Sequence, residues 1–327
     1  MKQGILLTVI AIFTLGCDNS IDILAPKQER PIVYALWSVH DSLPRIRIQR
    51  TFLNPNQDAH EVAKHPDSIY YSHPISVTVE EWKNDALQQV ISFTEYKDFA
   101  KDSGIFHYPY LPIYRPASAV QLDAEAEYVL KVKVGERLPT VKARTPLVGS
   151  ASFLNPRPAS PPSEFRFSML NTYVISWFPA KHAYYYDLWV IYNILEIRGI
   201  DTQHLRLRIP LLRMTPSRPN QRMSYVLTAE SFYRDIRQHL TIDSTITRRF
   251  GNAIFYYRGV EQQAYYYEIL NSTTQGINQT DTFYTNIQNG IGLFSSATVD
   301  SVLTVPFIGV LDSLRLNPTM KPYNFIY

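Results

Sequence analysis

The sequence predicts a mainly β protein built of β-sandwiches, with a small helical addition in its second half. Segments 45–50 and 75–82 alternate polar and apolar residues, and this period of two is typical of strands with one buried face and one wet face. Tyrosine, valine, isoleucine and threonine are frequent in such runs, which favours β-structure. A length of 327 residues favours two domains over one.

The first predicted domain is an N-terminal β-sandwich over residues 31–148. Leu122 precedes Tyr128 by six residues, and polar and apolar residues alternate from there on. This spacing is typical of the tyrosine corner of immunoglobulin-like and fibronectin type III-like sandwiches, where the tyrosine hydroxyl bonds to upstream backbone. The alternative is a tyrosine that leads a strand without a corner. We expect strands at 31–38, 45–50, 75–82, 87–93 and 128–134.

A proline-rich linker is predicted at 149–163, where four prolines lie among small polar residues. Proline fixes the backbone and removes a donor, so this segment is expected to be a semi-rigid connection. The C-terminal β-rich domain is then 164–327. Trp177 late in one strand and a tyrosine in the next, over 183–192, resemble the second and third strands of a fibronectin type III-like domain. The whole chain is therefore predicted to be a tandem of immunoglobulin- or fibronectin type III-like sandwiches.

One helix is predicted near 229–240 in the C-terminal domain. Thr228 is a suitable N-cap, and Phe232, Ile236 and Leu240 are spaced four apart on one face. Further strands are expected at 205–212, 224–228 and 253–257.

The N-terminus predicts a lipoprotein. Lys2 and an apolar run over 5–15 precede Cys17, the only cysteine of the chain. The run is shorter than the roughly 20 apolar residues of a membrane span, and it is typical of a cleaved signal peptide over 1–16. Acyl chains on Cys17, at about 0.8 kcal/mol per buried methylene, would anchor the protein to a membrane through a tether over 17–30. The alternative is an ordinary N-terminal strand or helix with an incidental cysteine.

Catalytic, metal and nucleic-acid functions find little support. The net charge of +3 does not suggest a basic face for nucleic acid. His60 and His65 are five apart instead of the four of the zinc-protease pattern, although His60, His65 and His73 with nearby aspartates could gather in a loop. No Gly-x-Ser-x-Gly elbow occurs, and Gly290 and Gly292 indicate a turn before a strand. We therefore predict no catalytic residues, no metal, no cofactor and no enzyme activity.

Tyrosine clusters are the strongest indication of binding. Adjacent tyrosines in a strand point to opposite faces, so one ring of each pair should lie outside the core of its own sheet. Exposed tyrosines serve as anchors at protein interfaces or as platforms for sugars. The alternative is that the rings fill the seam between the two halves or lie singly on the surface. The candidate binding aromatics are Tyr70, Tyr71, Tyr108, Tyr110, Tyr185 and Tyr266.

Several strings together resemble a domain-of-unknown-function family of Bacteroidota envelope lipoproteins. They include the export signal ending at Cys17, segments 31–36, 45–52, 66–71 and 101–106, and above all Asn-Ile-Gln-Asn-Gly-Ile-Gly-Leu-Phe at 286–294. The resemblance spans nearly the whole chain. It implies an outer-membrane location and an accessory role beside a TonB-dependent receptor, and it supplies no catalytic residues.

The resemblance also suggests O-glycosylation, because Bacteroidota modify Asp-Ser/Thr followed by a small or aliphatic residue. Five Asp-Ser pairs match this pattern or come close to it, and the alternative is that Asp-Ser suits turns before strands. The candidate serines are Ser42, Ser68, Ser244, Ser301 and Ser313.

The function expected from the sequence is that of a non-catalytic, lipid-anchored outer-membrane protein that binds a partner in an envelope complex. The alternative is a lipoprotein that binds a glycan or another solute through exposed tyrosines. A hydrolase would need polar groups that converge in one pocket.

Overall fold

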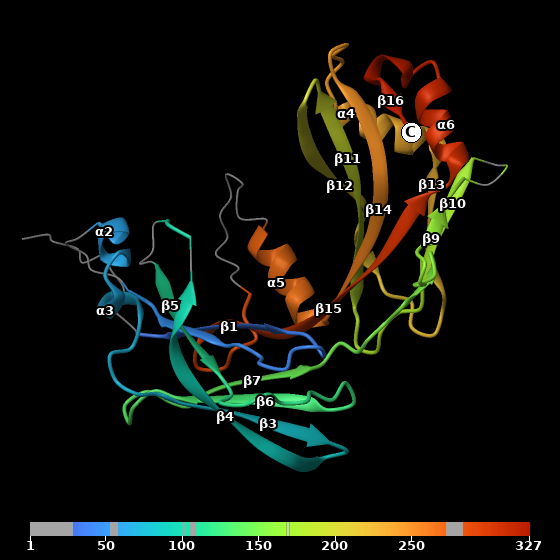
Figure 1. Ribbon diagram of the computed structural model, residues 1–327. Helices are drawn as coiled ribbons and strands as arrows, with labels where there is room; N and C mark the ends of the chain where they lie inside the picture. The colour runs from blue at the N-terminus through green and yellow to red at the C-terminus, as the bar shows by residue number, and fades with distance from the viewer. Residues whose placement is uncertain are drawn as a thin grey trace, which may run out of the picture.

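The computed structural model describes residues 29–52, 58–100, 102–104, 109–167, 169, 171–272 and 284–327. It confirms the predicted fold class, since packed sheets form the two bodies of the protein and short helices are added to them (Figure 1). The signal peptide over 1–16, the lipid-bearing Cys17, the candidate aromatic Tyr108 and all but the last two residues of the tether over 17–30 lie outside the described residues.

The first body contains a five-stranded sheet of order β5-β4-β3-β6-β7, which packs on β1, β2 and the start of β15. Isolated bridges from Ile46 to Tyr114 and from Lys142 to Gln288 connect the two layers at opposite sides. The bounds are β1 Pro31–Trp37, β2 Arg47–Arg50, α2 Ala59–Ala63, α3 Pro66–Ile69, β3 Ser76–Lys83, β4 Ala86–Ala100, β5 Tyr110–Arg115, β6 Glu127–Lys133 and β7 Val141–Pro146.

The predicted tyrosine corner is present in the first body. The Tyr128 hydroxyl accepts a hydrogen bond of 2.7 Å from the backbone N–H of Asp123, while the Tyr128 side chain is completely buried. Around it, Trp37 stacks on Phe93 with ring centroids 5.7 Å apart and meets Phe294 edge to face at 5.1 Å. The core therefore joins residues from both ends of the chain.

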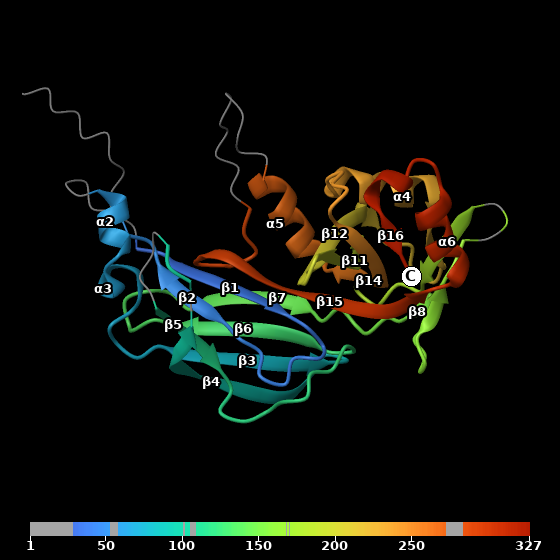
Figure 2. The ribbon, with the colours of Figure 1, turned by 45° about the horizontal axis from the view of Figure 1, so that its top comes forward.

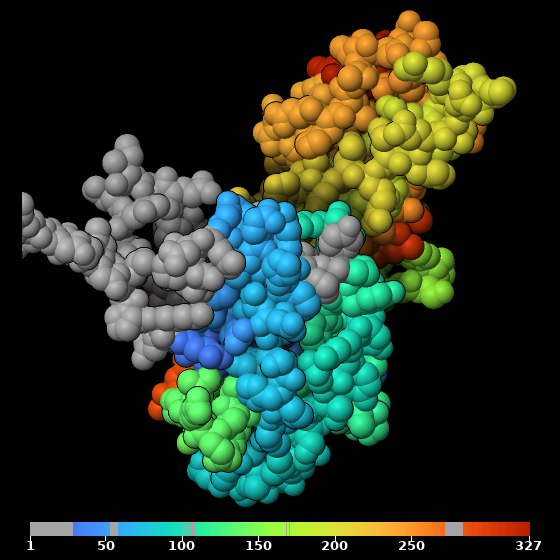
Figure 3. Space-filling model, turned by 90° about the vertical axis from the view of Figure 1, so that its left-hand side faces the viewer, coloured from blue at the N-terminus to red at the C-terminus, as the bar shows by residue number. Residues whose placement is uncertain are grey.

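The second body is a long curved sheet of order β12-β11-β14-β15, packed on the three-stranded sheet β13-β10-β8 and on α4 and α6. The elements are β8 Phe153–Asn155, β9 Ser163–Phe165, β10 Thr172–Trp177, β11 Tyr185–Arg198, β12 Asp201–Pro216, β13 Met223–Thr228, α4 Ala229–His239, β14 Thr247–Val260, α5 Gln262–Ser272, β15 Ile291–Pro306, α6 Ile308–Leu316, the 3₁₀ helix η1 Lys321–Tyr323 and β16 Phe325–Ile326. In Figure 3 this body, in yellow and orange, projects as a lobe from the teal first body.

The predicted helix is confirmed as α4. The Thr228 side chain accepts a hydrogen bond from the N–H of Ser231, as an N-cap does, and Phe232 and Ile236 are completely buried. The predicted tryptophan core is also present, since the Trp177 and Tyr257 rings stack with centroids 6.0 Å apart.

Strand β15 belongs to both bodies, which the predicted division at 149–163 does not anticipate. Its first residues pair in parallel with β1, from Ile291 opposite Ile32 to Ser296 opposite Trp37. Its later residues pair with β14, from Ala297 onward, in antiparallel register. Figure 2 shows β15 running from beside β1 into the second body. Residues near the C-terminus therefore complete the N-terminal core.

The segment 149–163 is not a free linker. Its Phe153 is 3% exposed in the core of the second body, β8 pairs with β10, and Ser163 begins β9 beside β15. Prolines are tolerated at the edges and starts of short strands, so a proline-rich composition does not exclude strands here.

The helix α5 lies in the angle between the two bodies (Figure 1).

Candidate binding site

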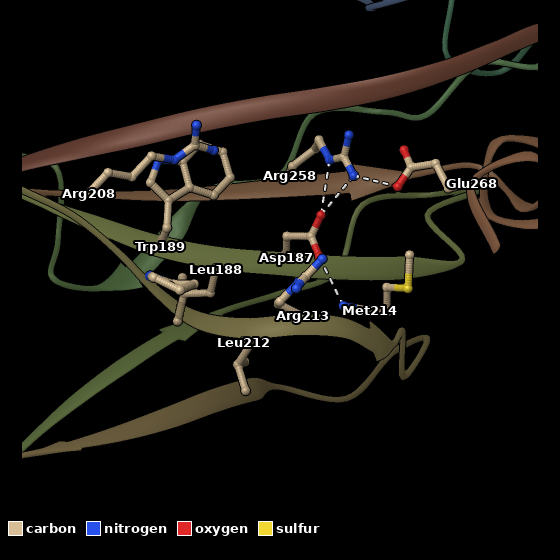
Figure 4. Close-up of a pocket in the computed structure, with 10 residues that line it drawn as sticks. Asp187, Leu188, Trp189, Arg208, Leu212, Arg213, Met214, Arg258 and Glu268 are labelled. Atoms are coloured by element: carbon tan, nitrogen blue, oxygen red, sulfur yellow. Dashed lines mark hydrogen bonds and ion pairs between the residues drawn. The ribbon is translucent and has the colours of Figure 1, made fainter. Parts of the chain in front are cut away.

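A hollow of about 430 Å³ lies on the outer face of the second body, between β11, β12, β14 and the helix α5. Figure 4 shows the side chains that line it. Strand alternation turns Asp187 and Trp189 of β11 away from the core and toward the hollow, whereas Leu188 and Val190 are buried in the core. The hollow therefore uses the sheet face that the core leaves uncovered.

Arg258 of β14 is the centre of a charged network in this hollow. Its Nε and Nη2 donate to Asp187 Oδ2 at 3.1 and 2.8 Å, and Nη2 also donates to Glu268 Oε2 of α5 at 2.9 Å. The Tyr185 hydroxyl donates to the same Glu268 oxygen at 2.7 Å. Both carboxylates of the hollow are thus already bound to one arginine.

The network also accounts for two perturbed groups. Burial disfavours the charged form of Arg258, but the neighbouring Tyr185, Glu268 and Asp187 outweigh it and raise the pKa of the guanidinium. Burial, with the hydrogen bond to Glu268, raises the pKa of Tyr185 well above its ordinary value. Over the ordinary pH range Arg258 therefore stays charged and Tyr185 stays neutral.

The β11–β12 pairing is irregular at the hollow. Its register shifts between Tyr186 and Leu188 and again between Leu188 and Trp189, so β12 carries extra residues at two bulges. Met214 in the first bulge has a φ of 46°, and its N–H donates to Asp187 Oδ1 at 2.9 Å. Arg213, the other residue of that bulge, lines the hollow.

An aromatic stack forms the other side of the hollow. The Trp189 and Tyr256 rings on neighbouring strands are parallel, with an angle of 1° and centroids 5.2 Å apart. The guanidinium carbon of Arg208 lies 4.7 Å from the centroid of the Trp189 ring. Such cation–π contacts hold an arginine in place over its aromatic neighbour.

The lining favours binding over catalysis. Among the described residues that line it there is no serine, threonine, cysteine or histidine, and its carboxylates Asp187 and Glu268 are bound to Arg258. Within the described residues, Arg208 and Arg213 have no carboxylate within ion-pair distance. The arrangement can attract an anion, and it offers no activated nucleophile.

Most candidate tyrosines are not exposed, which corrects the sequence-based expectation. Tyr70, Tyr71 and Tyr185 are 7%, 8% and 1% exposed, and Tyr266 is half-buried. Tyr110 is exposed at 53%. Tyr70, Tyr71 and Tyr110 do come together, since they line a second hollow of about 310 Å³ beside α3 and β5.

The helix α5 is the reason for the burial of Tyr185. Residues Tyr265, Tyr266 and Tyr267 lie on this helix, so their rings point in different directions around it. Tyr265 packs on Tyr185 with centroids 5.2 Å apart, and Tyr267 meets Tyr34 of β1 edge to face at 6.1 Å. As the alternative interpretation held, the rings fill the seam between the two halves.

The candidate glycosylation serines lie in different settings. Ser42, Ser244 and Ser301 are exposed, and Ser301 lies within β15. Ser68 and Ser313 are half-buried in the helices α3 and α6. The idea that Asp-Ser merely marks turns before strands therefore does not explain Ser68, Ser301 or Ser313.

The sequence analysis missed the charged residues of the hollow. The arginines of β12 were visible as alternate positions of 205–212, whereas the pairing of Asp187 with Arg258 depends on contacts between distant strands. Among the described residues, no three histidine, cysteine or acidic side chains are close enough together to hold a metal ion. The described helices include none whose length and apolar character would allow it to cross a membrane.

No protein-family model matches the chain, and a search of curated proteins finds no similar sequence.

Proposed function

We propose that the protein is a non-catalytic outer-membrane lipoprotein that binds a partner protein of an envelope complex through the outer face of its long sheet. The observation that carries this proposal is the apolar stripe on the outer face of β15. Val299, Leu303 and Val305 are 50%, 41% and 37% exposed there, with the exposed Ser301 between Val299 and Leu303, while the alternate Val302 and Thr304 are buried. Exposed apolar surface that continues over several residues is typical of an interaction site.

The stripe continues across the neighbouring strands. Val299 lies opposite Arg258, and Leu303 lies opposite Ile254 of β14, whose own neighbour on β11 is Ile191. Ile254, Tyr256 and Ile191 are half-buried and face outward with the stripe. The centre of this face is therefore apolar and aromatic, as the centres of protein interfaces are.

The rim of this face is positively charged. On β12, Arg208 is exposed and lies opposite Ile191 of β11. Complementary charge steers association and fixes orientation, so the partner is expected to present carboxylates around an apolar patch.

The location of the partner follows from the predicted lipid anchor. Acyl chains on Cys17 would hold the body near one bilayer, and the resemblance to envelope lipoproteins favours a TonB-dependent receptor in the same outer membrane. The bound carboxylates of the hollow support a binding role in place of an enzymatic one.

The test is a pull-down from native membranes with the acylated full chain, in wild-type form and as Leu303→Glu. We expect a specific partner with wild type and its loss with the variant, because a carboxylate cannot be buried unpaired in an apolar interface. Leu316→Glu is the matched control, since Leu316 is 62% exposed on α6, away from the stripe. Recovery of the bait alone, or equal recovery with Leu303→Glu, would contradict the proposal.

A second candidate function is glycan binding at the hollow of Tyr70, Tyr71 and Tyr110. The exposed Tyr110 ring could stack on a sugar, with Glu95 and Lys97 at its edge as hydrogen-bonding groups. A screen of oligosaccharides against wild type and Tyr110→Ala tests it: saccharide binding that the variant loses supports this function, and no binding by wild type opposes it.

A further inference from the structure

We infer that the hollow between β11, β12 and β14 binds a carboxylate group, which Arg208 and Arg213 hold while an apolar part of the ligand lies against Trp189. The inference rests in part on the proposed function, because Arg208 lies on the rim of the partner-binding face as well as in the hollow. The carboxylate can belong to an acidic side chain of the partner or to a small organic acid.

The charge balance of the hollow gives the first argument. Three arginines line it, Arg208, Arg213 and Arg258, against the carboxylates Asp187 and Glu268. Arg258 binds both of these carboxylates, so neither of them neutralises the charge of Arg208 or Arg213. A hollow with two uncompensated guanidinium groups attracts an anion, and a planar carboxylate matches the geometry of a guanidinium.

The fixed position of the two arginines gives the second argument. Arg208 lies over Trp189, which is itself stacked on Tyr256, so the guanidinium is held before any ligand arrives. Arg213 lies in the bulge whose next residue, Met214, is tied by its backbone to Asp187. Groups that are already ordered lose less entropy on binding, and bulges often re-aim side chains beside functional sites.

The uncharged lining indicates what accompanies the carboxylate. Trp189 is half-buried, and Pro210, Leu212 and Met214 also line the hollow. These groups favour a ligand with an apolar substituent next to its acid group, as in an N-acylated apolar amino acid. A volume of about 430 Å³ accommodates a group of this size.

Arginines on an edge strand also have a simpler role. β12 pairs only with β11, and charges on such an edge discourage unwanted strand pairing. Arg206 separates the two explanations, because it lies on the outer face of the same strand as Arg208 but does not line the hollow. If the arginines only protect the edge, replacing Arg206, Arg208 or Arg213 should affect ligand binding equally. If the hollow is a binding site, only Arg208 and Arg213 should matter.

The experiment titrates the full chain in detergent with N-acetyl-leucine and follows tryptophan fluorescence and calorimetry. We expect saturable binding with a dissociation constant on the order of 1 mM, weakened by salt, and at least about tenfold weaker binding of the uncharged N-acetyl-leucinamide. Arg208→Gln and Arg213→Gln should each weaken binding about tenfold or more, and Arg206→Gln should leave it unchanged. Trp189→Phe should abolish the fluorescence change.

Two outcomes would overturn the inference: no saturable binding of N-acetyl-leucine up to about 50 mM, or equal effects of the variants at 206, 208 and 213. The pull-down from membranes then identifies the source of the carboxylate. Partner loss with Arg208→Gln and Arg213→Gln assigns it to the partner protein, and partner retention assigns it to a small acid; both support the site. An empty wild-type pull-down contradicts the proposed function without affecting the titration.

Discussion

A Cβ atom on Gly292 would lie 2.0 Å from the carbonyl oxygen of Val33 on the neighbouring strand. Gly292 opens the parallel pairing of β15 with β1, and its φ of 119° lies in a region that residues with a side chain rarely adopt. The glycine therefore allows the close approach through which a strand from the end of the chain completes the N-terminal core.

Replacement of Gly292 by alanine is expected to destabilise the protein by about 4 kcal/mol or more, because both the contact and the backbone angle are incompatible with a methyl group. The matched control is Gly199→Ala, which has a positive φ of 59° but no atom within 4 Å of the new Cβ, and should cost about 1 kcal/mol. Urea unfolding measures both. Similar costs for the two variants would show that strand contact is not the cause.

Arg248 is the second position at which one side chain determines stability. It is completely buried, its Nε bonds Glu196 Oε1 at 2.7 Å, and it donates to the carbonyl oxygens of Tyr323 and Thr241. Arg248→Met should lower the free energy of unfolding by about 3–5 kcal/mol, because it leaves a carboxylate and buried carbonyls without their partner. Arg249→Met, next to it and exposed, should change stability by less than about 0.5 kcal/mol. A small loss of stability in both variants would contradict the role of Arg248 as a side chain that determines stability.

Local patterns predicted the elements well where the deciding contacts are close in sequence. Alternation located β3 and β6, and the four-residue spacing after Thr228 located α4. The spacing of Leu122 and Tyr128 predicted a hydrogen bond that the structure contains. In each case the periodicity of one segment reports directly on which of its faces is buried.

Contacts between distant segments could not be predicted in the same way. The helix that carries the tyrosines at 265–267 was not predicted, although the preceding Glu261 accepts from the N–H of Gln263 and caps it. The hollow around Arg258 depends on register shifts between β11 and β12, which no periodicity reveals. Likewise, the string at 286–294 carries the resemblance to envelope lipoproteins, while its role in joining β15 to β1 appears only in the fold.

The tyrosine corner has a measurable energetic role. Tyr128→Phe removes the acceptor of the Asp123 N–H and should cost about 1–2 kcal/mol, because the donor is left without its partner. Tyr186→Phe should behave alike, since the Tyr186 hydroxyl accepts from the N–H of Ala180 at 2.6 Å. Tyr110→Phe serves as the exposed control and should be neutral within about 0.5 kcal/mol in thermal or urea unfolding. A neutral Tyr128→Phe would mean that the corner bond contributes nothing to stability.

Glu261 connects α5 to β15 and makes stability depend on pH. Its carboxylate is 4% exposed and accepts from Ser295 Oγ and from the N–H of Gln263, both at 2.7 Å. Burial raises the pKa of Glu261 above its ordinary 4.5, although these hydrogen bonds lower it in part. In the pH range between 4.5 and the raised pKa, the folded protein binds more protons than the unfolded chain.

The stability that the raised pKa of Glu261 contributes is therefore fully present below pH 4.5 and is lost as the pH rises through the raised pKa. Tyr284, the titratable neighbour, has a raised pKa and remains neutral throughout this range. Relative to wild type, Glu261→Gln should gain stability with increasing pH, since glutamine stays uncharged. Glu136→Gln, at a side chain that is 90% exposed, should show a constant difference from wild type. Urea unfolding at a series of pH values gives both differences. Parallel curves of stability against pH for wild type and Glu261→Gln would show that burial of this carboxylate does not make stability depend on pH.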